Sequence, residues 1–387
     1  MKKIGILTYH DSLNYGSFLQ AYSLKEKIAR EYPKYKVEII NYSKPFMHNN
    51  KWKSIVVCGR KDFRDFFTQY KIFRTFKEHK SYLSLTSKHF VTDDYSSVLE
   101  EINKEYAAII VGSDTVLNYS RGFPNIYILD KELNGAKLYY AASVHGLDFQ
   151  NIPQGDVQKW KHTLSDFDFI GVRDEISIDF VKSIDSTLNP QFTCDPTYFY
   201  EEPKHISSTN LERKLYEKYK LDKNKKIIGI MSYNDDVGKF LKEKYGDKFN
   251  IVSLYRRNKY ADAFLYDLTP FEWAKVFSYF EFTVTQFFHG TLFSLKNSTP
   301  VVAFGRTNLE NDYKGKVEDI LQRAGLEKFF IKNFDINTQC TQKEFAHLIN
   351  VCRQDFNSEG IKNTFRKEAE SFKSFKNQLD RLLNIDN

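Results

Sequence analysis

Short apolar segments alternate with longer helical stretches along the whole chain of 387 residues, and this alternation restricts the possible folds more than any other feature. Each segment has the length of a buried strand and ends in a polar or glycine-containing turn. The segments lie at 3–8, 37–41, 107–111, 138–142 and 169–172 in the first half, and at 226–232, 250–254, 282–285 and 300–304 in the second. Strands separated by helices form parallel, doubly wound sheets. The pattern predicts an α/β fold of two Rossmann-like domains facing a central cleft, where open parallel sheets bind ligands.

Prolines and serines after the fifth apolar segment indicate where one domain ends and the next begins. A chain of this length is typical of two domains of roughly 150–200 residues each. Pro196, Pro203 and Ser207-Ser208 interrupt the periodicity before the strand expected at 226–232. We therefore expect a first domain at 1–205, with a basic aromatic insertion near 45–90, and a second domain at 206–387, with a helical tail at 359–383 that closes the chain.

Several classes of protein are excluded by what the chain lacks. It has no run of about 18 apolar residues, which a transmembrane helix would need. The apolar stretch at the N-terminus is too short for a signal peptide and is expected to form the first strand. The four cysteines, at 58, 194, 340 and 352, have no CxxC spacing, so we expect neither a zinc site nor a disulfide framework. Cys58, Cys194, Cys340 and Cys352 are therefore expected to be free thiols in the reducing cytoplasm.

One segment, 51–80, accounts for most of the positive charge of the chain. It carries nine Lys or Arg against Asp62, Asp65 and Glu78, a net charge of +6, and is rich in phenylalanine. One interpretation is an amphipathic helical insertion that packs on its own domain. The other is a peripheral contact with anionic lipid at the inner face of the cell membrane. Nucleic acid is not an expected partner, because no nucleic-acid-binding module accompanies the charge.

Two polar turns follow strands of the first domain. The loop with Asn14, Tyr15 and Gly16 precedes a helix, and exposed backbone N–H groups there would suit an anion or a sugar hydroxyl. It lacks the glycine pattern of dinucleotide sites and the P-loop lysine, and a purely structural turn fits equally well. In the second turn, Ser113, which we expect to contact the substrate, and Asp114 follow a buried strand. Asp114 could accept a proton from a sugar hydroxyl, or either residue could cap a helix.

Arg173 follows another strand of the first domain and has Asp174 and Glu175 beside it. A structural ion pair is the simplest interpretation. The alternative is an arginine that binds a carboxylate or phosphate through two parallel hydrogen bonds.

The strongest motif lies in the second domain, where a strand ends at His289-Gly290-Thr291 and a helix begins. A histidine at a helix N-terminus can hold a phosphate together with backbone N–H groups. Arg306 follows the next strand and is expected at the same edge of the sheet. The sequence shows no cluster of metal ligands.

Taken together and in order, these motifs resemble the polysaccharide pyruvyl transferase family. The matching stretches extend from residue 4 to about 330, and the ordered set is specific although each motif alone is weak. They are Ile4-Gly5-Ile6-Leu7-Thr8, Asn14-Tyr15-Gly16-Ser17-Phe18-Leu19-Gln20-Ala21-Tyr22, Val111-Gly112-Ser113-Asp114, Tyr140-Ala141-Ala142-Ser143, Val172-Arg173-Asp174, Cys194-Asp195-Pro196-Thr197, Phe288-His289-Gly290-Thr291 and Pro300-Val301-Val302-Ala303-Phe304.

The resemblance implies a GT-B-like fold, phosphoenolpyruvate as donor, and a sugar of a bacterial surface polysaccharide, such as a capsule or exopolysaccharide, or of its lipid-linked precursor as acceptor. The product would be a pyruvate ketal, released with phosphate and without a cofactor or metal. His289 would be the general acid and Asp114 would assist the attacking hydroxyl. Anchors for the anionic donor would be Arg173, Arg306, Gly290 and Thr291. The acceptor is expected on the first domain and the donor on the second.

The chain departs from the family pattern at three places. Many relatives have Gly-Ser-Asp-Gln-Xaa-Trp-Asn where this chain has 112–118, and Thr-Asp-Ser before Phe-His-Gly where it has Gln286-Phe287. Some carry an arginine at the position of Phe287, so donor binding would pass to Arg306 or Arg173. Two other functions stay open: a GT-B glycosyltransferase that uses a nucleotide sugar, and a non-catalytic sugar-binding protein.

Overall fold

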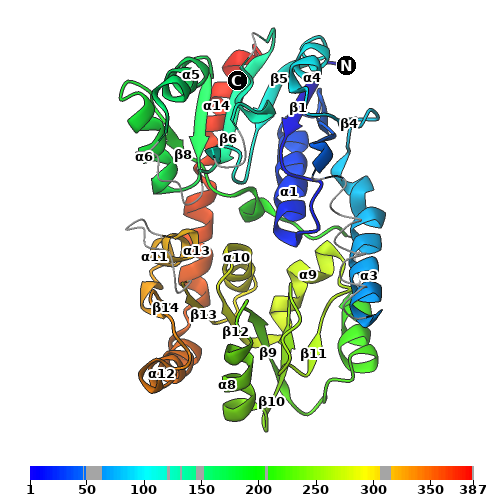
Figure 1. Ribbon diagram of the computed structural model, residues 1–387, viewed down its shortest axis with the longest axis vertical. Coiled ribbons are helices and arrows are strands. Elements are labelled where there is room, and N and C mark those ends of the chain that lie inside the picture. Colours follow the sequence, from blue (N-terminus) through cyan, green and yellow to red (C-terminus); the bar gives the residue numbers. More distant parts are fainter. Residues whose placement is uncertain are drawn as a thin grey trace. The chain divides into compact units, whose positions relative to one another are not determined.

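The chain forms two compact units in the computed structural model, which describes residues 1–46, 48, 63–119, 123–130, 133–144, 152–204, 208–305 and 315–385 (Figure 1). Unit 1 comprises Met1–Glu201 together with Lys367–Asn387, and unit 2 comprises Glu202–Arg366. Each unit contains one six-stranded sheet.

The sheet of unit 1 is parallel throughout. In spatial order its strands are β2 (Lys36–Ile39), β1 (Lys3–Leu7), β5 (Tyr106–Val111), β6 (Ala136–Ala142), β7 (Phe169–Val172) and β8 (Gln191–Phe192). The chain moves outward to β2 and then returns to the other side of β1, so the strand order reverses between β1 and β5. Ligands of open parallel sheets bind at the carboxyl ends of the strands at such a point.

The sheet of unit 2 is also parallel and has the strand order of a Rossmann fold. Its strands are β11 (Ala263–Phe264), β10 (Phe249–Ser253), β9 (Lys226–Met231), β12 (Phe280–Thr285), β13 (Val301–Phe304) and β14 (Phe330–Ile331). The order reverses between β9 and β12. The predicted α/β fold with two Rossmann-like domains is therefore confirmed.

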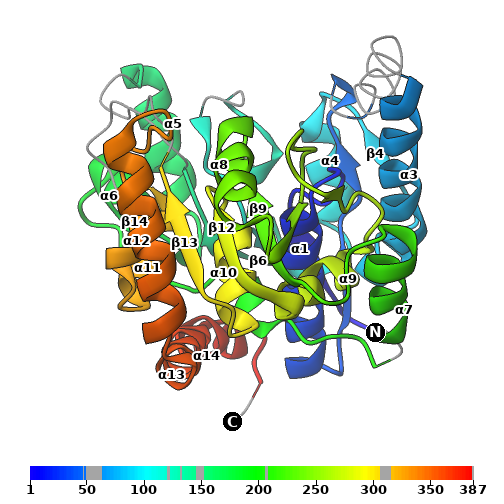
Figure 2. The same cartoon turned by 90° about the horizontal axis from the view of Figure 1, so that it is seen from below.

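Helices cover both sheets. Those of unit 1 are α1 (Tyr15–Glu31), α3 (Phe63–His79), α4 (Tyr95–Ile102), α5 (Gln154–Ser165), α6 (Glu175–Ile184) and α14 (Phe372–Leu382). Those of unit 2 are α7 (Ser208–Arg213), α8 (Asp235–Tyr245), α9 (Pro270–Val276), α10 (Phe288–Lys296), α11 (Lys316–Arg323) and α12 (Gln339–Asp355), and α13 (Ser358–Ala369) runs across the division between the units. Helix α12 packs on β12 and β13, as Figure 2 shows.

The tail of the chain differs from our expectation, because its last helix belongs to unit 1 rather than to the second domain. Successive residues of a strand face opposite sides of the sheet. In β6, Tyr139 joins a core cluster with residues of α5 and α6, whereas the ring of Tyr140 lies 4.9 Å from that of Phe375 in α14. Tyr140 and Phe375 are both fully buried. Helix α14 therefore covers a face of the first sheet that the first 200 residues leave open.

The insertion packs on unit 1 through α3, although residues 51–62 of the basic segment lie outside the described residues. Phe76 is 3% exposed, and its ring lies 4.9 Å from that of Tyr15 in α1. On the same helix Phe67 and Tyr70 are 48% and 41% exposed. Two short parallel strands, β3 (Tyr42–Ser43) and β4 (Phe90–Val91), flank the insertion. Among the described residues, none of the helices has the length and apolar character needed to cross a membrane.

Candidate functional site

The turn after β5 gives Asp114 its position in unit 1. Gly112 has a φ of 129°, and a Cβ atom there would lie 2.0 Å from the backbone oxygen of Tyr140. Only glycine fits such a conformation so close to the next strand. Asp114 itself has a φ of 77°, in the left-handed region that non-glycine residues seldom adopt. Strain of this kind is often found at functional sites.

The carboxylate of Asp114 is held by donors from several elements. One oxygen accepts hydrogen bonds from the Ser17 hydroxyl at 3.2 Å and the Gln20 amide at 3.1 Å, both in α1. The other accepts from the backbone N–H of Thr115 at 2.8 Å. The side chain remains 21% exposed. Asp114 is therefore both oriented and accessible, which a general base requires. Ser113 beside it is 1% exposed, and its hydroxyl has no hydrogen-bond partner among the described residues.

Arg173 is buried at the centre of three carboxylates. It donates to Asp195 at 2.7 Å, and its guanidinium nitrogens lie 3.7 Å from an oxygen of Asp114 and 3.9 Å from one of Asp174. Burial alone would lower the pKa of Arg173, but Asp195, Asp114 and Asp174 raise it above its ordinary value. Arg173 thus forms structural ion pairs, as the simplest interpretation expected, but its closest partner is Asp195 rather than the neighbouring Asp174 or Glu175. Binding of a substrate by Arg173 stays a prediction.

Residues of the first loop also have local contacts. The Asn14 side chain caps α1 by accepting from the N–H groups of Gly16, at 2.8 Å, and Ser17, at 3.3 Å. Tyr15 is 6% exposed and packs on Phe76. The cap occupies two of the N–H groups that we expected to meet a ligand, and a substrate contact of Asn14, Tyr15 or Gly16 stays a prediction.

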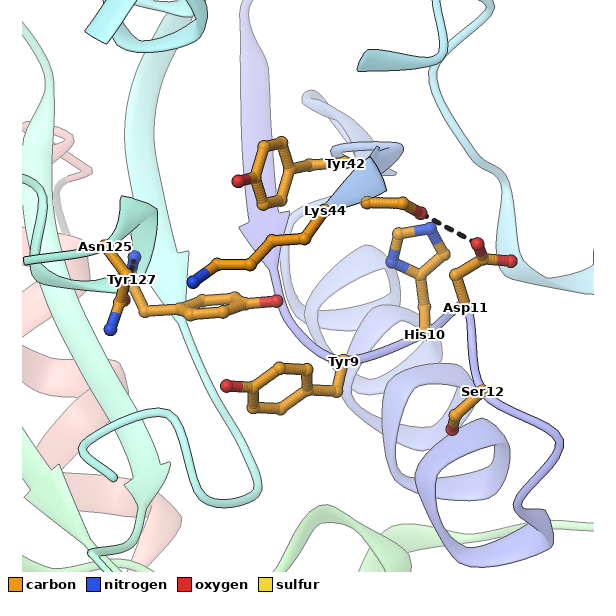
Figure 3. Close-up of a pocket in the computed structure, with 9 residues that line it drawn as sticks. Tyr9, His10, Asp11, Ser12, Tyr42, Lys44, Asn125 and Tyr127 are labelled. Atoms are coloured by element: carbon orange, nitrogen blue, oxygen red, sulfur yellow. Dashed lines mark hydrogen bonds between the residues drawn. The ribbon is translucent and has the colours of Figure 1, made fainter. Parts of the chain in front are cut away.

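A small cavity of about 50 Å³ lies beside the carboxyl end of β1 (Figure 3). The rings of Tyr9 and Tyr127 are 4.6 Å apart, and Lys44 extends across toward Asn125 and Tyr127. Tyr42 is 4% exposed, and its hydroxyl makes no hydrogen bond to any described residue. Burial raises the pKa of Tyr42 to about 12, with Asp93 adding to the effect, so the hydroxyl keeps its proton. The cavity is lined by Tyr9, His10, Asp11, Ser12, Tyr42, Ser43, Lys44, Asn125 and Tyr127.

The sequence analysis missed this tyrosine pocket because its residues come from three separate segments. The first segment follows β1, the second includes β3, and the third follows β5. The only available signal was the polar character of the residues after β1, which continues past Thr8 into His10 and Asp11.

In unit 2, His289 lies in the first turn of α10, directly after β12. A Cβ atom on Gly290 would lie 2.6 Å from the Thr285 hydroxyl and 2.8 Å from the sulfur of Met231, so glycine lets the helix approach the ends of β9 and β12. Thr291 is fully buried, and its hydroxyl donates to the backbone oxygen of Phe287. The side chain of His289 is half-buried. Phe287 precedes the helix and offers no side-chain cap, so the first-turn N–H groups suit an anion.

Aromatic side chains surround this helix start. The ring of Phe287 lies 5.0 Å from that of Tyr233, after β9, and 4.9 Å from that of Tyr255, after β10. Tyr233 and Tyr255 are 41% and 38% exposed. Arg256 is exposed and donates to the backbone oxygen of Tyr233 at 2.9 Å. The sequence analysis missed Tyr233, Tyr255 and Arg256. Arg306, which it selected, lies outside the described residues.

Replacing Arg173 with Met should destabilise the protein, because Asp195, whose side chain is 1% exposed, would lose its cation. Breaking a buried pair in this way costs about 3–5 kcal/mol. Arg30→Met is the matched control, since Arg30 pairs with Glu201 at 2.7 Å but is 55% exposed, and exposed pairs contribute about 0–1 kcal/mol. The measurement is the free energy of unfolding in urea. Equal losses in the two variants would contradict a structural role for Arg173.

Comparison with solved structures agrees with the observed architecture. The chain is similar to a UDP-GlcNAc 2-epimerase from Neisseria meningitidis bound to UDP-GlcNAc, with 13% identity over 97% of this chain and 100% of the other and a TM-score of 0.53. It is also similar to the S. aureus protein MnaA in complex with UDP (10% identity, 100% and 98% coverage, TM-score 0.53). A third similar structure is the UDP-GlcNAc 2-epimerase from Methanocaldococcus jannaschii, with 13% identity over 95% of this chain and 99% of the other and a TM-score of 0.52. At such identities the likeness shows the GT-B-like fold alone.

Comparison with curated protein sequences finds no match. The family model described as polysaccharide pyruvyl transferase matches residues 14–308, which is most of the chain. The matched range begins at the Asn14 cap and includes the Asp114–Arg173 network and the His289 helix start. The chain therefore belongs to the polysaccharide pyruvyl transferase family, whose enzymes transfer pyruvyl groups to polysaccharide.

Proposed function

We propose that this protein transfers the pyruvyl group of phosphoenolpyruvate to two hydroxyls of one sugar in a bacterial surface polysaccharide or its lipid-linked precursor. The product is a pyruvate ketal, and inorganic phosphate is released. The observation that carries the proposal is the family match across residues 14–308, which contains a histidine in the first turn of a helix that has no side-chain cap.

The donor side of the proposal rests on unit 2. Phosphoenolpyruvate carries a phosphate and a carboxylate, so it needs cationic or N–H-rich anchors. The start of α10 supplies N–H groups as far as Gly290, whereas the N–H of Thr291 donates to the backbone oxygen of Phe287. Arg256 adds an exposed guanidinium after β10. Arg306 keeps its expected role as a further anchor. The exposed rings of Tyr233 and Tyr255 would pack against the body of the ligand.

The chemistry requires one acid and one base. His289 gives a proton to the methylene carbon of phosphoenolpyruvate, which makes the neighbouring carbon electrophilic. A sugar hydroxyl then adds to that carbon and releases its proton to Asp114, and the carbon–oxygen bond to phosphate breaks. A second hydroxyl of the same sugar closes the ketal on the same carbon and gives its proton to His289, which restores the acid. Arg173 keeps Asp114 in place through the carboxylate network.

The acceptor side of the proposal rests on the tyrosine pocket of unit 1. Sugars combine apolar ring faces with hydroxyl edges, and pockets that bind them offer aromatic rings and a few placed polar groups. Tyr9 and Tyr127 supply the rings, and the buried hydroxyl of Tyr42 supplies a hydrogen-bonding group without a partner in the described residues. At about 50 Å³ the cavity accommodates one edge of a sugar rather than a whole ring.

A nucleotide-sugar glycosyltransferase is the second candidate. The observation that favours it is the aromatic group of Phe287 with the exposed Tyr233 and Tyr255, on which a nucleobase could stack. Isothermal titration with UDP and with phosphoenolpyruvate separates the two functions. Binding of UDP without binding of phosphoenolpyruvate would favour the glycosyltransferase. Binding of saccharide alone would favour a non-catalytic sugar-binding protein.

His289→Ala should lower kcat by roughly 100- to 10,000-fold, the usual effect of losing a general acid or base. The measurement is phosphate release from phosphoenolpyruvate that depends on added saccharide. His347→Ala is the control, because His347 is exposed on α12 of the same unit. Near-wild-type turnover in the His289 variant would show that this histidine only packs.

Tyr42→Phe should raise the KM for the saccharide by roughly 2- to 10-fold, the effect of losing one net hydrogen bond of about 0.5–1.5 kcal/mol. The KM for phosphoenolpyruvate should not change. The fold should be at least as stable as before, since a buried hydroxyl without a partner is removed. Tyr245→Phe is the control in unit 2, because its hydroxyl is also buried without a partner among the described residues. An unchanged saccharide KM would place the acceptor elsewhere.

We also propose that the protein works in the cytoplasm against the inner face of the cell membrane. Helix α3 carries Phe67, Tyr70, Lys71 and Arg74 at a spacing that places them on one face, and all are exposed. Replacing Lys71, Arg74 and Lys77 with Gln should reduce sedimentation with anionic liposomes at low salt. Replacing the exposed Lys239, Lys343 and Lys362 should have less effect. A wild-type protein that does not sediment with these liposomes would rule out the contact.

A further inference from the structure

Three side chains that commonly bind metal ions meet beside the carboxyl end of β1. Asp11 follows β1, His48 lies before the insertion helix α3, and His89 precedes β4. Each offers one ligand atom, and these atoms all lie within 4.8 Å of one another. We infer that Asp11, His48 and His89 form a binding site for a divalent transition-metal ion, for which zinc is the best chemical match.

The distances suit a site that closes slightly when it binds an ion. Ligand atoms at about 2.0–2.2 Å from a tetrahedral zinc lie roughly 3.3 Å from one another. One oxygen of Asp11 lies 3.8 Å from Nδ1 of His48, and the three ligand atoms all lie within 4.8 Å of one another, so the side chains must rotate to close the site. That nitrogen of His48 is buried and has no hydrogen-bond partner in the described part of the chain. The two histidine rings are 5.2 Å apart and approach edge to face, and Nε2 of His89 lies 3.2 Å from the Ser43 hydroxyl, which also contacts Asp11.

The burial of His89 favours the form of its imidazole that binds a metal ion. Zinc binds the neutral imidazole, and protonation competes with it. Burial lowers the pKa of His89 below its ordinary value, and the nearby His48, Lys80 and His10 lower it further, against an opposing effect of Asp11.

Neighbouring groups orient the carboxylate as they do in known metal sites. Lys80 donates to one oxygen of Asp11 at 2.5 Å, and the Ser43 hydroxyl donates to the other at 2.7 Å. Carboxylate ligands are normally hydrogen-bonded in this way by groups that do not touch the metal. Lys80 bonds to one oxygen, so the oxygen nearer His48, which accepts from Ser43, is the one that would ligate the ion. Its charge, together with Lys77 on the same cavity, also means that the ion is held less tightly than in a purely structural zinc site.

The site has room for a further ligand. The three residues line a cavity of about 220 Å³, whose other walls include Phe73 and Phe76. Zinc sites with three protein ligands keep a fourth position for water or a substrate oxygen. His10, Asp11 and Ser12 line both this cavity and the tyrosine pocket. An oxygen ligand on the ion would therefore lie close to the residues that this cavity shares with the tyrosine pocket.

Sequence spacing did not indicate this site, and the sequence analysis expected no cluster of metal ligands. That expectation came from the spacing of cysteines and from the lack of closely spaced ligands. The three residues are far apart in the chain, and the pairing of β3 with β4, together with backbone contacts of residues 39–41 with 84–90, brings the segment of His89 beside that of His48.

The test is a titration of the full chain, without an affinity tag and after treatment with EDTA, with Co²⁺ as a spectroscopic substitute for zinc. We expect one Co²⁺ per chain, visible absorption bands of a nitrogen-containing site, and displacement by Zn²⁺. His48→Gln and His89→Ala should each weaken binding at least about 10-fold. His162→Ala should bind as the wild type does, because His162 is exposed on α5 and outside the cluster.

Thermal unfolding gives an independent measurement. Zn²⁺ should raise the Tm of the wild type and of His162→Ala, and should not raise the Tm of the two cluster variants. His48 is 43% exposed, so its variant should fold even if His89→Ala does not. Absence of Co²⁺ binding by the wild type up to millimolar concentration would overturn the site. So would binding by His48→Gln equal to that of the wild type. Neither measurement depends on pyruvyl transfer, so the site and the proposed function can fail separately.

Discussion

A single buried guanidinium holds together the carboxyl edge of the first sheet. Arg173 contacts carboxylates that follow β5, β7 and β8, and it is 5% exposed. One arginine cannot neutralise three carboxylates, so hydroxyl and amide donors complete the network. Ser17 and Gln20 bond to Asp114, Ser143 bonds to Asp174, and Thr197 bonds to Asp195. These contacts join four loops and one helix into a rigid platform, from which Asp114 stays partly accessible.

In the second sheet, close packing rather than charge holds the carboxyl ends of the central strands together. Gly290 lets α10 approach the ends of β9 and β12, and the Gln286 side chain accepts from Ser232 and from the N–H of Tyr233. The two strands at the point of reversal are thereby joined. His289 and the first-turn N–H groups of α10 are then presented from a fixed backbone, which favours the binding of an anion.

The central strands were predictable because each is a continuous apolar run, buried on both faces. The edge strands β8, β11 and β14 have two residues each and leave no such signal. The position of α14 could not be foreseen, since it depends on which face of β6 the earlier helices leave uncovered. Motif order located Asp114 and His289 at the carboxyl ends of their strands, but burial of Arg173 among three acids is a tertiary property. The tyrosine pocket and the Asp11–His48–His89 cluster arise only from contacts between distant segments.

The central claim is that the chain moves a pyruvyl group from phosphoenolpyruvate onto a sugar. The most direct measurement is mass spectrometry of a saccharide panel after incubation with the protein and with phosphoenolpyruvate labelled with ¹³C in the pyruvyl carbons. The account predicts a labelled saccharide heavier by one pyruvate less one water, with one phosphate released per product. Transfer of a sugar from UDP-GlcNAc or another nucleotide sugar, with no labelled product from phosphoenolpyruvate, would contradict it.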